Sequence, residues 1–274
     1  GTFTRSTGCT ISGNNHVAVS NTLAINGTNT DMNNLITITA TTNKRHFYLN
    51  NANAKLILRY LKLVGGDVSS YSSSPDRLGG SILIYDPNGG ELNLYSSIVF
   101  NNKAKYGGGI YAWGASGTNK NAIMNIYNSI IHNNEATDRG GGIYAYGDSN
   151  TNKNDRIMNI DNSIIHNNTA TYGYGGGIYM RNAVAAIENT TIDYNQASSD
   201  GGYGGGMSIV SSAVTMKNTN ISNNKAGDRG GGLGGSRGGT PGGVTGGAAG
   251  GGGYGGGDGG GDGGGGDGGG GEGG

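Results

Sequence analysis

The sequence contains very little of several residue types, and each shortage excludes a class of protein. The one cysteine among 274 residues, Cys9, cannot form a disulfide within the chain. No apolar run approaches the roughly 18 residues of a membrane-spanning helix; the run at 56–58, for example, ends at Arg59. No charged and apolar leader follows Gly1, so we expect a processed product with no membrane span.

The chain also has no excess of either charge sign. Its 18 basic and 18 acidic residues give a formal net charge of zero. A protein that binds nucleic acid mainly through its phosphates needs a positive surface, because its affinity comes from the release of counterions. The composition therefore predicts no nucleic-acid partner.

Glycine, in contrast, is abundant and unevenly placed. The chain has 60 glycines, and 32 of them lie between Gly227 and Gly274. From Leu233 onward almost no side chain is large enough to bury, so this part cannot form a core of its own. We predict a glycine-rich tail over residues 233–274.

The part before the tail repeats itself. Five ten-residue segments share a β-branched residue, a following asparagine and a final alanine: 95–104, 127–136, 161–170, 188–197 and 217–226. A glycine triplet follows each of them: 107–109, 140–142, 175–177, 204–206 and 230–232. Triplets spaced 26 to 35 residues apart are typical of a solenoid with variable loops.

The residue types of the repeat favour strands over helices. Ser, Thr, Asn and Gly are poor helix formers, and most apolar positions hold Ile or Val. We predict an all-β fold, a right-handed parallel β-helix of about eight rungs stacked about 4.8 Å apart. Its coil covers residues 17–232, and residues 1–16 form the N-terminal cap that a solenoid requires.

Stacked rungs place equivalent residues above one another. One inward apolar ladder is predicted from Val99, Ile131, Ile165, Ile192 and Ile221. A structural asparagine ladder is predicted from Asn102, Asn134, Asn168, Asn195 and Asn224. Each stacked amide can donate to the next carbonyl oxygen, which satisfies a bend that the backbone alone leaves unpaired.

The repeats carry a family resemblance in two elements. These are Phe100 with the asparagines after it, and the Gly-Gly-Gly-Ile-Tyr runs such as 107–111. On these residues the chain resembles the pectin-lyase-like β-helix superfamily, in particular the polymorphic outer-membrane-protein branch with its FxxN and GGA[IVL] repeats. Here a third glycine replaces the alanine, and His132 and His166 replace the phenylalanine. The resemblance spans residues 23–232 and implies the fold, which carries lyases, hydrolases, adhesins and structural proteins alike.

Alignment of the rungs also places titratable side chains in columns. His132, His166 and Asp193 fall in one outward column, and such a set can ligate a metal. Phe100 and Ser222 occupy the equivalent positions in other rungs, which favours an ordinary solvent-facing column. We therefore predict no metal site.

A second column holds Asp161 and Glu188 about 5 Å apart, a separation found in retaining glycosidases. Lys217 follows them and partly neutralises the pair, and no cleft residues are recognisable around it. The superfamily's enzymes also carry Asp-Asp, Gly-His-Gly and Arg-Ile-Lys signatures, and none of these occurs in the sequence. We predict no catalytic residue, no cofactor and no enzymatic activity.

Two further sets of residues are candidates for contact with glycans. Tyr111, Tyr144 and Tyr179 are predicted to stack into an aromatic strip that either grips sugar rings or stabilises the coil surface. Four N-x-[ST] sequons mark possible N-glycosylation at Asn26, Asn167, Asn189 and Asn220. Asn189 and Asn220 lie inside the repeat, where we expect packing to block a glycan, so Asn26 is the better candidate.

These features favour a non-catalytic extracellular structural protein. Open β-helix ends are unpaired sheet edges, and head-to-tail contacts that do not close produce filaments. We expect a homopolymer with the glycine-rich tail in the contacts between subunits. The alternatives are a cell-surface adhesin or carbohydrate-binding rod and, less favoured, a polysaccharide lyase or hydrolase.

Overall fold

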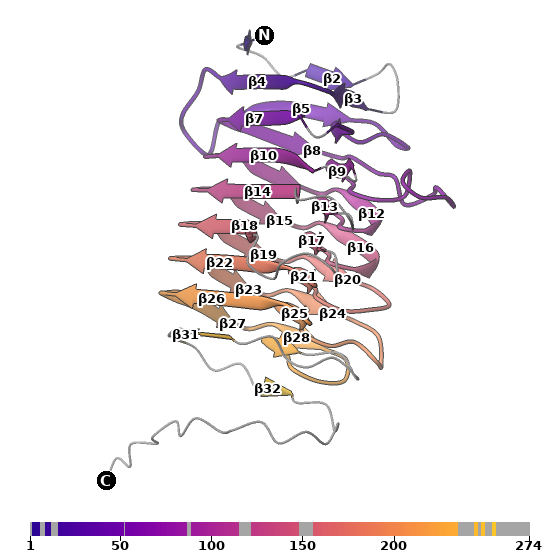
Figure 1. The fold of residues 1–274 in the computed structure, drawn as a ribbon, viewed down its shortest axis with the longest axis vertical. Coiled ribbons are helices and arrows are strands. Elements are labelled where there is room, and N and C mark those ends of the chain that lie inside the picture. Colours follow the sequence, from indigo (N-terminus) through magenta and orange to yellow (C-terminus); the bar gives the residue numbers. More distant parts are fainter. Residues whose placement is uncertain are drawn as a thin grey trace.

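The computed structural model describes residues 2–5, 9–11, 16–51, 53–86, 89–114, 122–147 and 156–234, and the short strands 244–245, 248–249 and 254–255. These residues form a parallel β-solenoid whose strands stack along one axis (Figure 1). The described part contains no helix, so none of it is a helix long and apolar enough to cross a membrane. The predicted all-β parallel β-helix is confirmed.

Three sheets of nine strands and a fourth of five run along the solenoid. The first sheet consists of β1 (Thr2–Arg5), β4 (Thr22–Gly27), β7 (Lys55–Arg59), β10 (Gly90–Tyr95), β14 (Ala122–Tyr127), β18 (Arg156–Asp161), β22 (Val184–Glu188), β26 (Ala213–Lys217) and β30 (Val244–Thr245). The second consists of β2 (Cys9–Ile11), β5 (Ile36–Ala40), β8 (Leu61–Val64), β11 (Ile98–Phe100), β15 (Ile130–His132), β19 (Ile164–His166), β23 (Thr191–Asp193), β27 (Thr219–Ser222) and β31 (Ala248–Ala249).

The third sheet consists of β3 (Val17–Val19), β6 (Phe47–Leu49), β9 (Ile82–Asp86), β13 (Ile110–Gly114), β17 (Ile143–Tyr146), β21 (Ile178–Arg181), β25 (Met207–Val210), β29 (Leu233–Gly234) and β32 (Tyr254–Gly255). The short sheet consists of β12 (Lys103–Tyr106), β16 (Glu135–Arg139), β20 (Thr169–Ala170), β24 (Gln196–Ala197) and β28 (Lys225–Ala226). Each rung that contains a repeat segment therefore has four sides.

The described coil makes about six turns. On the third sheet eight strands, β3 to β29, stack between Val17 and Gly234. The prediction of about eight rungs agrees with this number of strands. It is higher than the number of turns, which is about six.

Strands are also described within the segments predicted as cap and tail. β1 and β2 pair in parallel with β4 and β5, so they extend two sheets by one strand each. At the other end β30, β31 and β32 pair with β26, β27 and β29. Apart from these three strands, residues 235–274 of the predicted glycine-rich tail lie outside the described residues.

Aliphatic side chains fill the interior in register. The predicted ladder of Val99, Ile131, Ile165, Ile192 and Ile221 is at most 3% exposed. A second ladder, on the first sheet, is at most 1% exposed and consists of Leu58, Leu94, Ile126, Ile160 and Ile187. Because these inward side chains stack on apolar side chains in the rungs above and below, one continuous hydrophobic core runs through the coil.

The asparagine ladder lies at the corner between the second sheet and the short sheet. Amide nitrogens of Asn102, Asn134, Asn168 and Asn195 each donate to Oδ1 of the next asparagine, at 2.9 to 3.0 Å. Their backbone N–H groups donate to the same oxygens at 2.8 to 3.1 Å. The first four are at most 1% exposed, and Asn224 at the end is half-buried.

The glycine triplets turn the chain at the next corner. Their first residues, Gly107, Gly140, Gly175, Gly204 and Gly230, have φ between 64° and 69°. A side chain at Gly140 would also place its Cβ 2.4 Å from the carbonyl oxygen of Ile143. Only glycine meets both constraints without strain.

One buried histidine lies in the N-terminal half of the coil. His46 is 0% exposed, with Nε2 3.0 Å from the carbonyl oxygen of Ile38 and Nδ1 3.0 Å from Oγ of Ser81. Burial lowers the pKa of His46 from 6.5 to about 4. The folded state therefore binds a proton at His46 less readily than the unfolded chain does.

This difference predicts acid sensitivity. Because the folded pKa is depressed, the contribution of neutral His46 is fully present above pH 6.5 and is lost as the pH falls toward 4. The expected loss is about 3 kcal/mol, since one pKa unit corresponds to about 1.4 kcal/mol. The free energy of unfolding, measured in urea between pH 7 and pH 4, should fall by this amount in the wild type and by less in His46→Gln. Equal decreases in the two proteins would contradict the assignment.

Candidate functional site

Aromatic residues gather on the outer face of the third sheet. One column runs through Tyr48, Leu83, Tyr111, Tyr144 and Tyr179, which are in register on successive strands. The Tyr111 and Tyr144 ring centroids lie 4.7 Å apart, and those of Tyr144 and Tyr179 lie 4.8 Å apart, both pairs stacked. Parallel strands force this stacking, because each ring sits one rung from its neighbour.

A second column runs beside the first, two residues further along each strand. Tyr85, Trp113, Tyr146 and Arg181 are in register there. The Tyr85 and Trp113 rings stack with centroids 4.5 Å apart, and the Arg181 guanidinium lies 5.8 Å from the centroid of the Tyr146 ring. All three aromatic residues are only half-buried.

The remaining walls come from other parts of the coil. Tyr106 on β12 stands edge-on to Tyr144, with centroids 5.7 Å apart. Arg139 on β16 lies over the ring of Tyr179, and Ser74 and Leu78 come from the loop between β8 and β9.

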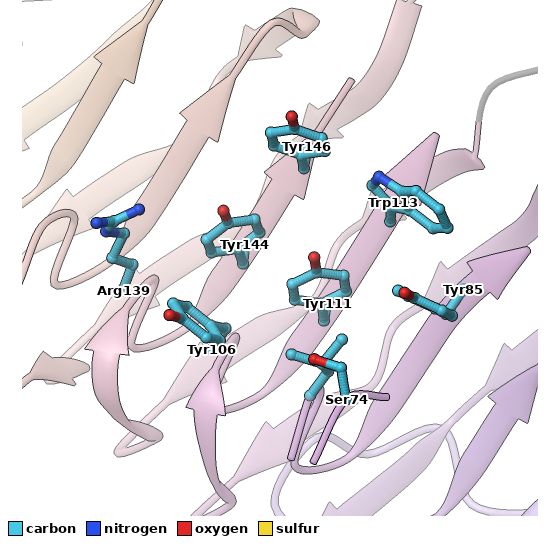
Figure 2. Close-up of a pocket in the computed structure, with 9 residues that line it drawn as sticks. Ser74, Tyr85, Tyr106, Tyr111, Trp113, Arg139, Tyr144 and Tyr146 are labelled. Atoms are coloured by element: carbon cyan, nitrogen blue, oxygen red, sulfur yellow. The ribbon is translucent and has the colours of Figure 1, made fainter. Parts of the chain in front are cut away.

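Together these residues enclose an open groove of about 310 Å³ (Figure 2), which we call the aromatic groove: Ser74, Leu78, Tyr85, Tyr106, Tyr111, Trp113, Arg139, Tyr144 and Tyr146. In Figure 2 the hydroxyl groups of Tyr111, Tyr144 and Tyr146 point the same way, and so does the indole nitrogen of Trp113. The groove thus combines aromatic walls with a set of polar groups that face the same side.

The groove is neutral to basic at physiological pH. Burial raises the pKa values of Tyr106, Tyr111 and Tyr144, so their hydroxyl groups stay protonated; that of Tyr106 hydrogen-bonds to Asp138, and those of Tyr111 and Tyr144 can both donate and accept. Arg139 supplies a positive charge, and its Nε lies 3.3 Å from Oδ1 of Asp138. No acidic side chain is among the described residues that line the groove.

The predicted tyrosine strip contributes to this groove in a restricted way. Tyr111, Tyr144 and Tyr179 are 8%, 6% and 3% exposed, and their ring faces cover one another. Tyr111 and Tyr144 therefore present their hydroxyl edges to the groove, while their ring faces are occupied. The more accessible aromatic surface belongs to Trp113 and its column.

Sequence reasoning missed that second column. The signal was present, because Trp113 and Tyr146 follow Tyr111 and Tyr144 by two residues and so share their side of the strand. Tyr106 and Ser74 had no such signal. Their positions depend on the short sheet and on a loop that the repeat pattern does not specify.

The predicted histidine column forms on the second sheet. His132 and His166 stack with centroids 4.8 Å apart, Phe100 stacks below His132, and Asp193 is in register beyond His166. Burial lowers the pKa of His132 to about 4 and also lowers that of His166. Across the part of the chain that the structure describes, no group of three His, Cys, Asp or Glu residues is arranged to hold a metal ion.

The acidic column lies on the first sheet, away from the groove. Asp161, Glu188 and Lys217 are in register on β18, β22 and β26. Asn189 donates from Nδ2 to Oδ1 of Asp161 at 2.8 Å. Neither carboxylate is among the residues that line the aromatic groove.

The four sequons occupy different environments. Asn26 lies within β4, is half-buried and accepts a hydrogen bond from Arg59 at 3.4 Å, so it is not on a loop. Asn167 and Asn189 are exposed at corners with φ near 50°, and Asn220 is exposed on β27. Packing therefore leaves Asn189 and Asn220 exposed, contrary to expectation, while Asn26 as the better candidate for a glycan stays a prediction.

No protein-family model, curated protein sequence or solved structure matches the chain. Its fold and its groove geometry are therefore the basis for assigning a function.

Proposed function

We propose that the protein is a non-catalytic, extracellular carbohydrate-binding rod of the pectin-lyase-like β-helix type, and that it binds glycans in the aromatic groove. The observation that carries this proposal is the pairing of half-exposed aromatic walls with hydroxyl and N–H groups that face the same side. Ligand sites typically combine an apolar lining with a few placed polar groups.

A sugar ring suits this surface chemically. Its C–H face packs against aromatic carbon, while its hydroxyl groups need hydrogen-bond partners as they leave water. Trp113 and Tyr146 offer the aromatic surface, and the Tyr111 and Tyr144 hydroxyl groups offer donors and acceptors.

Hydrolysis is a less favoured reading of the same groove. Glycoside hydrolases of the common types need two carboxyl groups beside the scissile bond. The described lining residues contain none, and the nearby Asp138 is paired with Arg139. The groove thus supports binding better than cleavage.

A glycan array followed by titration of the tightest oligosaccharide tests this function. Trp113→Ala should weaken binding about tenfold or more, the usual cost of removing an aromatic anchor from a binding site. The matched control is Tyr127→Ala, because Tyr127 also stacks on a neighbouring tyrosine, Tyr95, but lies on the first sheet. Absence of any glycan binding, or equal losses in the two variants, would contradict the proposal.

A second candidate function is self-assembly into a fibre, and one observation favours it. The glycine-rich segment adds β30, β31 and β32 to the last strands of three sheets through backbone pairing. Such pairing needs no particular side chain, so the same segment from a second copy can pair with an open sheet edge.

Negative-stain imaging of the intact chain and of a variant that lacks residues 235–274 tests this candidate. We expect filaments from the intact chain and single rods from the shortened one. Monomeric intact chain at high concentration would exclude polymerisation, and filaments from both proteins would exclude a role for the segment.

A further inference from the structure

A lysine, a glutamate and an asparagine meet on the outer face of the first sheet. Lys55 on β7 and Glu91 on β10 are in register, and Lys55 Nζ lies 2.9 Å from Glu91 Oε1. Asn93, two residues further along β10, donates from Nδ2 to the same oxygen at 2.7 Å. One carboxylate oxygen therefore joins an amine to a carboxamide in the adjacent rung.

These contacts limit how far apart the amine and the amide are. Because both nitrogens bond to Oε1 of Glu91, at 2.9 Å and 2.7 Å, Lys55 Nζ and Asn93 Nδ2 are at most 5.6 Å apart. Asn93 is 6% exposed, so its carboxamide is held in one place. A flexible lysine side chain can cover the remaining distance by rotation of its last bonds.

The asparagine carbonyl is polarised from the other side. Asn125 donates from Nδ2 to Oδ1 of Asn93 at 3.0 Å, and Asn159 donates to Oδ1 of Asn125 at 2.7 Å. The amides thus form a relay in which each donor strengthens the next and which ends on the Glu91 carboxylate. A donor aimed at this oxygen also stabilises negative charge that develops on it during attack at Cγ.

We propose that Lys55 and Asn93 form an isopeptide bond autocatalytically. Lys55 releases a proton to water, which leaves a neutral amine beside the Glu91 carboxylate. Nζ attacks Cγ of Asn93, and the oxyanion on Oδ1 accepts the Asn125 hydrogen bond. Glu91 takes a proton from Nζ and protonates Nδ2, so general acid–base catalysis comes from a single group.

The reaction balances without an added reagent. The Nζ–Cγ bond forms as the Cγ–Nδ2 bond breaks, no electrons are gained or lost, and ammonia leaves and takes up from water the proton that Lys55 released. Glu91 returns to its carboxylate form. The product ties β7 to β10 covalently and closes the chain between residues 55 and 93, which restricts the unfolded state as a disulfide does.

A second ion pair in the coil provides the matched comparison. Lys103 and Glu135 also lie on adjacent rungs, with Nζ 2.7 Å from Oε2 and similar exposure. Among the described residues, however, no asparagine amide hydrogen-bonds to Glu135. The Lys103–Glu135 pair therefore has the amine and the carboxylate but lacks an asparagine carboxamide for the amine to attack.

Intact-mass spectrometry of the full chain tests the proposal. The wild type should be lighter than its sequence mass by one molecule of ammonia, and its digest should contain a branched peptide that joins Lys55 to Asn93. Lys55→Arg and Glu91→Gln should each have the full mass of their own sequences. The control Glu135→Gln should keep the deficit.

Two results would overturn the proposal. One is a wild-type chain at its full sequence mass after prolonged incubation at neutral pH. The other is a mass deficit that persists in Lys55→Arg, since it would come from succinimide formation at another asparagine such as Asn26, which precedes Gly27. Far-ultraviolet circular dichroism confirms that each variant is folded, so a missing bond is not mistaken for a missing structure.

Discussion

The hydrogen bond from one buried asparagine to the next is the interaction on which the rest of this structure depends. At the corner after the second sheet the backbone turns, and its N–H and carbonyl groups cannot all pair with the neighbouring rung. Asn168 shows the solution: its Oδ1 accepts from both nitrogens of Asn134, and its Nδ2 donates to Asn195 and to the carbonyl oxygen of Ile131. Since buried polar groups are costly when unpaired, this corner sets the register of the five rungs that carry the ladder, Asn102 to Asn224.

Register then determines the chemistry of the outer faces. Once the rungs are aligned, any residue type that recurs in the repeat becomes a column with one member per rung. Tyrosines stack ring on ring on the third sheet, histidines stack on the second, and asparagine amides form a relay on the first. The aromatic groove and the proposed cross-link are both consequences of this alignment, although neither requires the other.

The repeat made much of this architecture predictable. The Ile and Asn ladders follow from segment alignment alone, because equivalent positions in a parallel coil must stack. The accessibility of Tyr144 was not predictable, since it depends on the closeness of the rings above and below. The position of Ser74 was not predictable either, nor was the meeting of Lys55 and Asn93 on one oxygen of Glu91, because loop paths and side-chain rotamers leave no periodic signal.

The most direct test of this account is the free energy of unfolding of Asn168→Ala, measured in urea. The substitution removes the four hydrogen bonds of the Asn168 side chain in a site that is 0% exposed. We predict a loss of at least about 3 kcal/mol, from about 1 kcal/mol for each of the hydrogen bonds lost. The exposed Asn220→Ser should change stability by no more than about 0.5 kcal/mol. Equal, small losses in both variants would contradict the central role of the asparagine ladder.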